Sequence, residues 1–278
     1  MTKKKSVKQS FDLTDMVAVI TGGAGLLGEK QAEAIAEFGG IPILLDIDKK
    51  AGTEKASKIA FEYQVNCEFQ FCDVTDESQI LDIRNALLSK FGRIDILINN
   101  AAIDPKVEAK SEINLSRLEN FSTDQWNLEL AVGLTGAMLC SKVFGHEISK
   151  NGKGVILNIS SDLGIIGPDQ RIYKKEGLSD HEQPVKPVTY SVIKHGLIGL
   201  TKYLATYWPG KVRCNALCPG GIYTNQSKEF VNKLSNLIPM GKMADINEYK
   251  AAIVFLVSDA SSYMNGAVIP IDGGRSCW

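Results

Sequence analysis

The stretch Thr21-Gly22-Gly23-Ala24-Gly25-Leu26-Leu27-Gly28 joins an apolar run, residues 16–21, to a segment with helical periodicity that ends near Phe38. Glycines at a strand-to-helix turn let the backbone approach a pyrophosphate, whose charge meets the free N–H groups and dipole of the helix. An acidic residue, Asp46, ends the next apolar run. This context favours a dinucleotide site over a plain tight turn. The residues expected to contact the cofactor here are Gly22, Gly25, Leu26, Leu27, Gly28 and Asp46.

Short apolar runs alternate with amphipathic helical segments along the whole chain, which is typical of repeated βαβ units on a parallel sheet. The expected strands are residues 16–21, 41–45, 67–72, 94–98, 154–159, 212–217 and 267–271. No linker or internal repeat divides the chain. We therefore predict one doubly wound α/β domain of the Rossmann type over 16–278, with about seven parallel strands and helices on both faces. Residues 1–15 are expected to form a tail, and the polar, proline-containing stretch 167–187 an inserted loop.

Composition excludes several functional classes. The 278-residue chain is 44% hydrophobic and 23% charged with a net charge of −1, so it lacks the electrostatic footprint of a protein that binds nucleic acid or an anionic membrane surface. The longest charge-free apolar stretches, 130–141 and 251–258, are shorter than the roughly 18 residues that suggest a membrane span. Residues 6–15 are too polar for a signal peptide, and six cysteines without a C-x-x-C pair argue against a metal site. We expect a cytoplasmic protein with reduced thiols and no metal.

A tyrosine and a lysine share one face of a later helical segment. Tyr190-Ser191-Val192-Ile193-Lys194 places the phenol and the ammonium group at positions i and i+4. A nearby cation and an oxidised nicotinamide both favour phenolate and lower the pKa of a tyrosine from about 10, so that Tyr190 can exchange a proton with a substrate hydroxyl or carbonyl. A surface Tyr and Lys without such a role remain the alternative reading of this short pattern.

These motifs together resemble the short-chain dehydrogenase/reductase family, in order along nearly the whole chain. The matching segments are TGGAGLLG at Thr21, Asp46, CDV at Cys72, NNAA at Asn99, NISS at Asn158, YSVIK at Tyr190 and PGGIYT at Pro219. The resemblance implies hydride transfer between nicotinamide C4 and a secondary alcohol or ketone carbon. Tyr190 would be the acid/base, Lys194 would bind the nicotinamide ribose, and Ser161 would hydrogen-bond the substrate oxygen. Ser161 matches the family's serine because Gly164 follows it, with Ser160 as the alternative.

The resemblance also implies further contacts with the cofactor. Asp73 and Val74 follow the third expected strand, and Asn100 and Ala101 follow the fourth, where the carboxyl ends of the sheet would meet adenine and ribose; a turn or a cap is the alternative for both. The segment that packs against the nicotinamide would contribute Pro219, Gly220, Ile222 and Thr224. Asp46 can accept hydrogen bonds from both ribose hydroxyls and would repel a 2′-phosphate, which favours NAD over NADP. Lys49 and Lys50 nearby weaken that preference.

Two positions depart from the family pattern. Leu26 stands where the family's middle glycine is common, and Gly133 stands where the catalytic tetrad commonly has asparagine. If the Gly133 carbonyl still anchors a water beside Lys194, the proton relay survives without the side chain. On that hypothesis, Gly133→Asn leaves turnover unchanged or raises it, and a collapse of activity shows that the glycine itself is needed.

The insertion is expected to lie beside the substrate because it immediately precedes Tyr190. Its cations are balanced by acids, so either a solvated loop or contacts with a phosphate or carboxylate fit its composition. Tyr173 is no rival to Tyr190, because Gly177 occupies its i+4 position. Together with the IDGGRSCW terminus, the insertion resembles bacterial members of flagellin-modification and surface-sugar pathways. This implies a sugar or amino-sugar derivative as substrate, and the family's apolar helices imply a homodimer or homotetramer.

The sequence thus predicts an NAD-dependent oxidoreductase acting on a sugar-like secondary alcohol. A 3-oxoacyl reductase or general carbonyl reductase is the alternative within the family, although it would not need the long insertion. A catalytically silent dinucleotide-binding regulator is the alternative of another class. Gly133 favours that alternative, whereas intact Ser161, Tyr190 and Lys194 oppose it.

Overall fold

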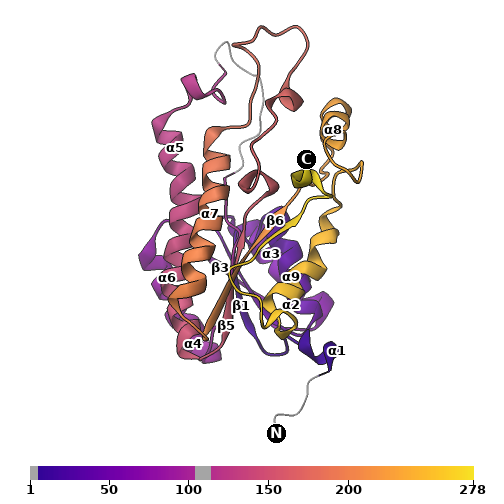
Figure 1. Cartoon of the computed structure of the whole chain (residues 1–278). Helices are drawn as coiled ribbons and strands as arrows, with labels where there is room; N and C mark the ends of the chain where they lie inside the picture. The colour runs from indigo at the N-terminus through magenta and orange to yellow at the C-terminus, as the bar shows by residue number, and fades with distance from the viewer. Residues whose placement is uncertain (1–5, 104–113) are drawn as a thin grey trace.

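The computed structural model describes residues 6–103 and 114–278, and these form a sheet of seven parallel strands (Figure 1). The strands are β1 (Val17–Thr21), β2 (Ile41–Asp46), β3 (Glu68–Phe71), β4 (Ile96–Asn99), β5 (Gly154–Ile159), β6 (Val212–Pro219) and β7 (Val268–Ile271). Their spatial order is β3-β2-β1-β4-β5-β6-β7, and every neighbouring pair is parallel. The predicted fold class is confirmed. The chain reverses direction across the sheet between β1 and β4, where doubly wound folds bind ligands beyond the strand ends.

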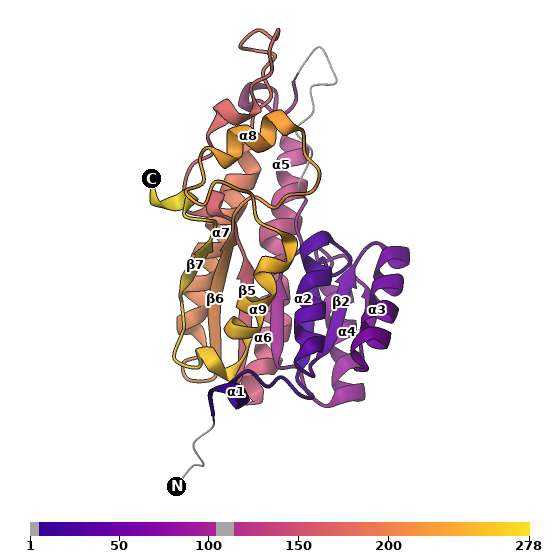
Figure 2. The ribbon, with the colours of Figure 1, turned by 90° about the vertical axis from the view of Figure 1, so that its right-hand side faces the viewer.

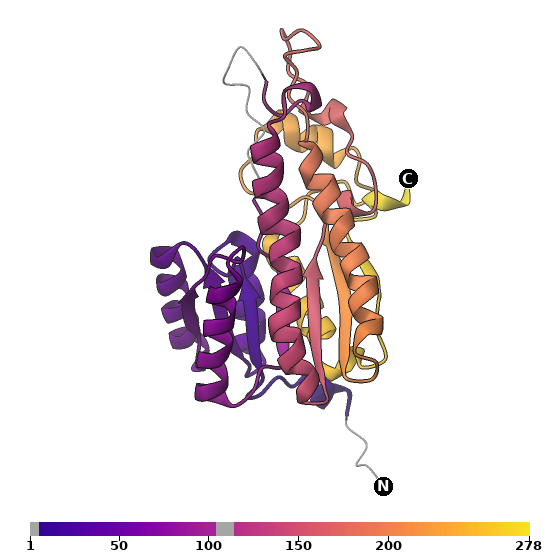
Figure 3. The ribbon, with the colours of Figure 1, turned by 90° about the vertical axis from the view of Figure 1, so that its left-hand side faces the viewer.

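Helices cover both faces of the sheet. One face carries α2 (Leu26–Glu37), α3 (Lys49–Tyr63) and α9 (Lys250–Val257) (Figure 2). The opposite face carries α4 (Glu77–Phe91), α6 (Gly136–Lys150) and α7 (Val188–Tyr207) (Figure 3). A π-helical segment, η2 (Ala131–Thr135), joins α6 to the preceding helix α5 (Thr123–Leu130) without a break. Because both faces are covered, the central strands are apolar throughout rather than alternating.

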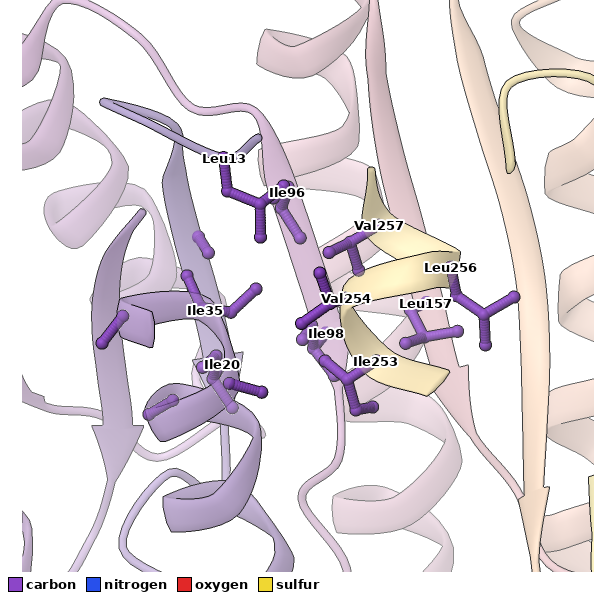
Figure 4. Packing of buried hydrophobic residues seen from close by; sticks show 14 of the residues in the cluster. Leu13, Ile20, Ile35, Ile96, Ile98, Leu157, Ile253, Val254, Leu256 and Val257 are labelled. Atoms are coloured by element: carbon purple, nitrogen blue, oxygen red, sulfur yellow. The ribbon is translucent and has the colours of Figure 1, made fainter. Parts of the chain in front are cut away.

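The hydrophobic core consists of two layers, one on each side of the sheet. In β1, Ala18 and Ile20 point toward α2 and α9, whereas Val17 and Val19 point toward α4 and α6. Figure 4 shows the first layer, in which Ile20 lies with Ile35 of α2 and Val254 of α9. These side chains are almost completely buried, so their burial from water contributes most of the stability of this layer.

The described part of the predicted tail packs against the core. Helix α1 (Val7–Ser10) precedes Phe11, whose ring lies 6.5 Å from that of Phe38 and 6.4 Å from that of Phe255. Leu13 is fully buried, and its N–H donates to the Phe38 carbonyl. Two apolar side chains of this otherwise polar segment, Phe11 and Leu13, thus cover the end of α2, and the domain boundary at residue 15 stays a prediction.

The inserted stretch 167–187 contains one short 3₁₀ helix, η4 (Gln170–Tyr173), and otherwise forms loops. Ile172 is buried with Leu234 of helix α8 (Lys228–Ser235) and with Ile238 and Met243. The insertion and α8 lie together beyond one end of the sheet (Figure 1). This placement joins two segments far apart in the sequence into one wall.

The continuous helical run 123–150 is long and apolar enough to cross a membrane by length and composition alone. Half of its most apolar window is buried inside the protein. Phe144 and Ile148 on this run belong to the second core layer, which accounts for the apolar composition.

Candidate active site

The glycines of the turn after β1 let its backbone pack closely against neighbouring backbone. Gly22 has a positive φ of 63°, and a Cβ there would lie 2.9 Å from the Ala101 Cα. A Cβ on Gly28 would lie 2.2 Å from the Gly22 carbonyl oxygen. Helix α2 begins immediately after Gly25, so its first N–H groups have no carbonyl one turn earlier to bond. The turn therefore presents backbone donors and a helix N-terminus to an anion.

Asn100 fixes the shape of this turn. Its amide nitrogen donates to the carbonyls of Thr21 at 3.0 Å and Gly22 at 3.1 Å, and its amide oxygen accepts from Gln31 at 2.9 Å. The Thr21 hydroxyl accepts in return from the backbone N–H groups of Asn100 and Ala101. The side chain of Asn100 thus holds the end of β4 against the glycine turn, a structural duty that the sequence motif does not reveal.

Asp46 ends β2 at the edge of the same turn. One carboxylate oxygen accepts from the Ala24 N–H at 3.0 Å, and the other accepts from the Asp48 N–H at 3.1 Å. These two bonds fix the orientation of the carboxylate while each oxygen keeps a further lone pair for a ligand. Asp46 therefore places a carboxylate of fixed orientation at the edge of the glycine turn.

A cleft of about 460 Å³ brings most of the predicted residues together at the carboxyl ends of the strands. Those that line it are Gly22, Gly25, Leu26, Leu27, Asp46, Asn100, Ser161, Tyr190, Lys194, Pro219, Gly220, Ile222 and Thr224. Ala102 lines the cleft after β4, next to the predicted Ala101. The glycine turn and the Tyr190 helix, which are more than 150 positions apart, thus face a common space.

Four predicted cofactor residues lie outside the lining of this cleft: Gly28, Asp73, Val74 and Ala101. Gly28 permits the turn, as described above. Asp73 accepts hydrogen bonds from the backbone and hydroxyl of Thr75, and Val74 is buried against Gly136 of α6. Contacts of Asp73 and Val74 with adenine stay a prediction, and the structure gives both residues local packing roles.

Tyr190 and Lys194 project from the first turns of α7. Lys194 is 6% exposed, and its ammonium group donates to the Ile159 carbonyl at the end of β5 at 2.9 Å. The same nitrogen lies 5.7 Å from the centre of the Tyr190 ring. The i, i+4 spacing therefore places a buried cation next to the phenol, as expected from the sequence.

The structure separates the roles of two adjacent serines. The Ser160 hydroxyl donates to the Lys194 carbonyl at 2.7 Å and so ties β5 to α7. The Ser161 hydroxyl donates to the Asp162 carboxylate at 2.7 Å and accepts from the Leu163 N–H. Because the Ser160 hydroxyl already donates its proton in a hydrogen bond to a backbone carbonyl, the geometry favours Ser161 as the serine that contacts a substrate oxygen.

Asp162 and Arg275 form a buried ion pair that sequence reasoning missed. The Arg275 guanidinium donates to Asp162 at 2.7 Å, and the two side chains are 6% and 4% exposed. Arg275 comes from the C-terminal turn, which Asp272 holds by accepting from the N–H groups of Gly274 and Ser276. Thus a residue near the C-terminus fixes the carboxylate that accepts the hydrogen bond of the Ser161 hydroxyl.

The outer wall of the cleft was also only partly foreseen. Tyr173 of the insertion and Phe230 of α8 line it with their ring centres 5.7 Å apart, and Lys186 lines it near Tyr190. The expected position of the insertion beside the site is thus observed. Its more exposed cation Arg171 points away into an ion pair with Asp169 at 2.7 Å. Only its place in the insertion linked Tyr173 to the site from the sequence, and no motif pointed to Phe230.

Gly133 lies in η2, where the side chain of Ile193 occupies the space that a larger residue needs. A Cβ on Gly133 would lie 2.8 Å from Ile193 Cγ2 and 3.3 Å from its Cδ1. This contact argues against the expectation that the single substitution to asparagine leaves turnover unchanged, because the Ile193 side chain of α7 occupies the space that the asparagine side chain needs.

We expect Gly133→Asn to destabilise the protein and to lower kcat by displacing α7. Overpacking of a filled core costs about 1–3 kcal/mol. In a urea double-mutant cycle with Ile193→Ala, most of this cost should disappear, because the alanine removes the obstructing atoms. Gly199→Asn is the matched control, since a Cβ at Gly199 meets nothing within 4 Å. Additive costs in the cycle would contradict this steric explanation.

Thiol and metal chemistry have no support at the site. Burial raises the pKa of the Cys218 thiol, near Ser160, to about 11, and that of Cys72 to about 12, so neither is a ready nucleophile. Among residues 6–103 and 114–278, no group of three or more His, Cys, Asp or Glu side chains lies together as metal ligands would.

The residues of the cleft fit a nicotinamide dinucleotide. The Gly22 cradle and the start of α2 offer donors to a pyrophosphate, and Asp46 offers acceptors to ribose hydroxyls. At the other end, Ser161, Tyr190 and Lys194 provide a hydroxyl, a phenol and a cation around one small volume. Such a set can bind an alcohol or carbonyl oxygen and move a proton to or from it.

Comparisons with known proteins agree with this geometry. Residues 23–276 match a family model described as enoyl-(acyl carrier protein) reductase. A D-threitol dehydrogenase from Mycolicibacterium smegmatis is 30% identical over 99% of this chain and 98% of its own. An NADP-dependent mannitol dehydrogenase from Hypocrea jecorina is 32% identical over 95% and 93%.

The fold is also similar to those of solved structures. A short-chain type dehydrogenase/reductase from Mycobacterium marinum superposes with a TM-score of 0.84 at 27% identity, covering 99% of this chain and 100% of its own. An NAD-dependent glycerol dehydrogenase from Listeria innocua, 29% identical over 97% of both chains, shows that cofactor preference varies among the relatives. The chain thus belongs to the short-chain dehydrogenase/reductase family and is an NAD(P)-dependent oxidoreductase of alcohols and ketones.

Proposed function

We propose that the protein is an NAD-dependent dehydrogenase of a secondary alcohol in a polyol, sugar or amino-sugar derivative. The observation that carries this proposal is the single cleft in which the glycine turn and Asp46 face the same space as Ser161, Tyr190 and Lys194. When bound, the nicotinamide supplies the group that accepts or returns a hydride. The chain itself supplies binding, orientation and proton transfer.

In the oxidation direction, the substrate hydroxyl lies between Ser161 and Tyr190. The Ser161 hydroxyl, which donates to Asp162 in this structure, turns to donate to the substrate oxygen, so that the single hydroxyl proton of the alcohol points to Tyr190. Tyr190 as phenolate takes the hydroxyl proton while the carbon loses hydride, which leaves a ketone and a neutral phenol. Lys194 favours the phenolate from its position beside the ring. In reduction, the Ser161 hydroxyl must turn from Asp162 toward the ketone oxygen, and Tyr190 returns the proton.

The preference for NAD over NADP rests on Asp46. A fixed carboxylate repels a 2′-phosphate, and the described lining of the cleft contains Asp46 but neither Lys49 nor Lys50. Lys49 instead lies 5.3 Å from the centre of the Phe71 ring. The carboxylate of Asp46 at this end of the cleft supports a preference for NAD over NADP.

We expect NADH to bind at least about tenfold more tightly than NADPH, which corresponds to roughly 1.4 kcal/mol. Asp46→Asn keeps the shape of the side chain and removes its charge, so it should reduce the ratio of the two dissociation constants toward one. Fluorescence titration of both cofactors measures this, and Lys50→Ala is the control expected to leave the ratio unchanged. Tighter binding of NADPH by the unmodified protein would contradict the preference.

A polyhydroxylated substrate is supported by the cleft and by the names of the relatives. Thr224, Gln226 and Lys186 add polar groups to the wall beyond Tyr190. The similar threitol and mannitol dehydrogenases are named for polyols. The proposed place in a surface-glycan pathway rests on the resemblance of the insertion and the C-terminus to members of such pathways.

NADH fluorescence against a panel of polyols, keto-sugars, sugar phosphates, amino-sugar derivatives and short acyl ketones tests the substrate class. The proposal expects the highest kcat/KM among the sugars and polyols. A preference for 3-oxoacyl compounds would instead identify an acyl reductase, and cofactor binding without turnover of any class would favour a silent regulator.

We also propose a cytoplasmic homodimer or homotetramer. Exposed apolar side chains include Leu128 of α5, Met138 of α6 and Tyr203 of α7, and these three helices are seen together in Figure 3. Burying them between copies of the chain would remove them from water. Light scattering of the purified protein measures the assembly, and a stable monomer at micromolar concentration would contradict it.

A further inference from the structure

Lys186 of the insertion lies directly over the ring of Tyr190. Its ammonium nitrogen is 3.6 Å from the ring centre, closer than the 5.7 Å of Lys194. Lys186 is half-buried, and all three side chains line the cleft. Two cations from different segments of the chain therefore act on one phenol.

A cation over an aromatic face is attracted by the negative charge of the π-system. This attraction is stronger for phenolate than for phenol, because ionisation adds negative charge to the ring. A positive charge at this position consequently favours the ionised form of the tyrosine. The pair of lysines provides more stabilisation of the phenolate than Lys194 alone.

Three further carboxylates among the described residues lie around this region or in the same cleft. Asp162 of the β5 end is paired with Arg275 of the C-terminal turn. Glu129 of α5 accepts hydrogen bonds from Thr189 and Gln125. Asp46 lies at the adenosine end of the cleft. Lys186 and Lys194 are the cations that the described residues place against the Tyr190 ring.

We propose that Lys186 is a positioning residue for Tyr190, a second cation that holds the phenol ready to act as a base. The inference rests on the proposed acid/base role of Tyr190 and extends it, since the cation comes from the insertion rather than from α7. In this view, the insertion contributes to proton transfer as well as to the substrate wall. Helix η4 docks against α8, and its Gln170 side chain accepts a hydrogen bond from the Lys186 N–H at 2.8 Å, which holds this end of the insertion near the ring.

The test compares Lys186→Met and Lys186→Arg with the unmodified enzyme. For oxidation of a neutral polyol, kcat/KM should rise with pH as Tyr190 ionises. In Lys186→Met the midpoint of this rise should move upward by about one pH unit, as expected for loss of a charge near the surface of a cleft. Lys186→Arg should restore the original midpoint. Lys175→Met removes a charge from an exposed site in the same insertion and should not move it.

A second measurement does not depend on finding the substrate. Tyrosinate absorbance of the NAD complex is titrated for each variant with Tyr190 and again with Tyr190→Phe, and the difference isolates the Tyr190 ionisation. The same upward shift in Lys186→Met, with unchanged NAD affinity, supports the proposal. If no panel compound is turned over, this titration still decides the role of Lys186 separately from the proposed function.

Two results would overturn the proposal. One is an unmoved midpoint in Lys186→Met by both kinetics and absorbance. The other is a KM that rises for a sugar phosphate but not for the neutral polyol while the midpoint stays in place, which would assign Lys186 to anchoring an anionic substrate.

Discussion

Tyr190→Phe should lower kcat/KM by about 10²–10⁴-fold while NADH binds with unchanged affinity. The substitution removes only the phenolic oxygen, so the ring keeps its place between the cleft and the two lysines. Without that oxygen, no group of α7 can exchange a proton with the substrate hydroxyl at this point. Steady-state kinetics and NADH fluorescence titration measure the two quantities on the same preparation.

The matched control is Tyr173→Phe. Tyr173 lines the same cleft with its ring tilted against that of Phe230, but it belongs to the wall formed by the insertion. Its loss should change KM more than kcat and by a few-fold only. Retention of full turnover in Tyr190→Phe would remove the tyrosine from the reaction, whereas turnover absent already in the unmodified protein would favour the regulatory alternative.

The parts of the molecule that were predicted from sequence are those set by local spacing. Gly22 and Gly28 lie within one strand-turn-helix unit, and Tyr190 and Lys194 lie one helical turn apart, so a short stretch of sequence is enough to recognise each pair. Parallel strands in turn bring their carboxyl ends to one edge, so local motifs meet without further information. The sheet and the main cleft residues follow from these rules.

What escaped prediction depends on contacts between distant segments. The Asp162–Arg275 pair joins positions 113 residues apart, and Gly133 meets Ile193 across two helices. Neither pairing leaves a periodic or spacing signal in a single sequence. The packing of Leu13 escaped prediction for the same reason, because its burial depends on where α2 and α9 pack. Three-dimensional proximity, rather than residue type, gives these side chains their roles.

Arg275→Met should be the most destabilising single change near the site. Arg275 and Asp162 are both buried, so removing the guanidinium leaves a carboxylate without its counter-charge in a low-dielectric environment. Breaking a buried pair in this way costs about 3–5 kcal/mol. Urea denaturation should show the loss as a lower midpoint with an unchanged slope. Arg171→Met breaks the exposed pair with Asp169 and should leave the midpoint where it was.

The same change should reach catalysis through Ser161. The Asp162 carboxylate orients the Ser161 hydroxyl by accepting its hydrogen bond at 2.7 Å, and Arg275 fixes that carboxylate from the other side. Arg275→Met should therefore lower kcat even at temperatures where the protein is folded, and NADH affinity should change little. Asp162→Asn combined with Arg275→Met removes the stranded charge and should recover stability without recovering kcat, because the amide at position 162 lacks the Arg275 bond that fixes its orientation toward Ser161. Recovery of both together would show that the pair acts on folding alone.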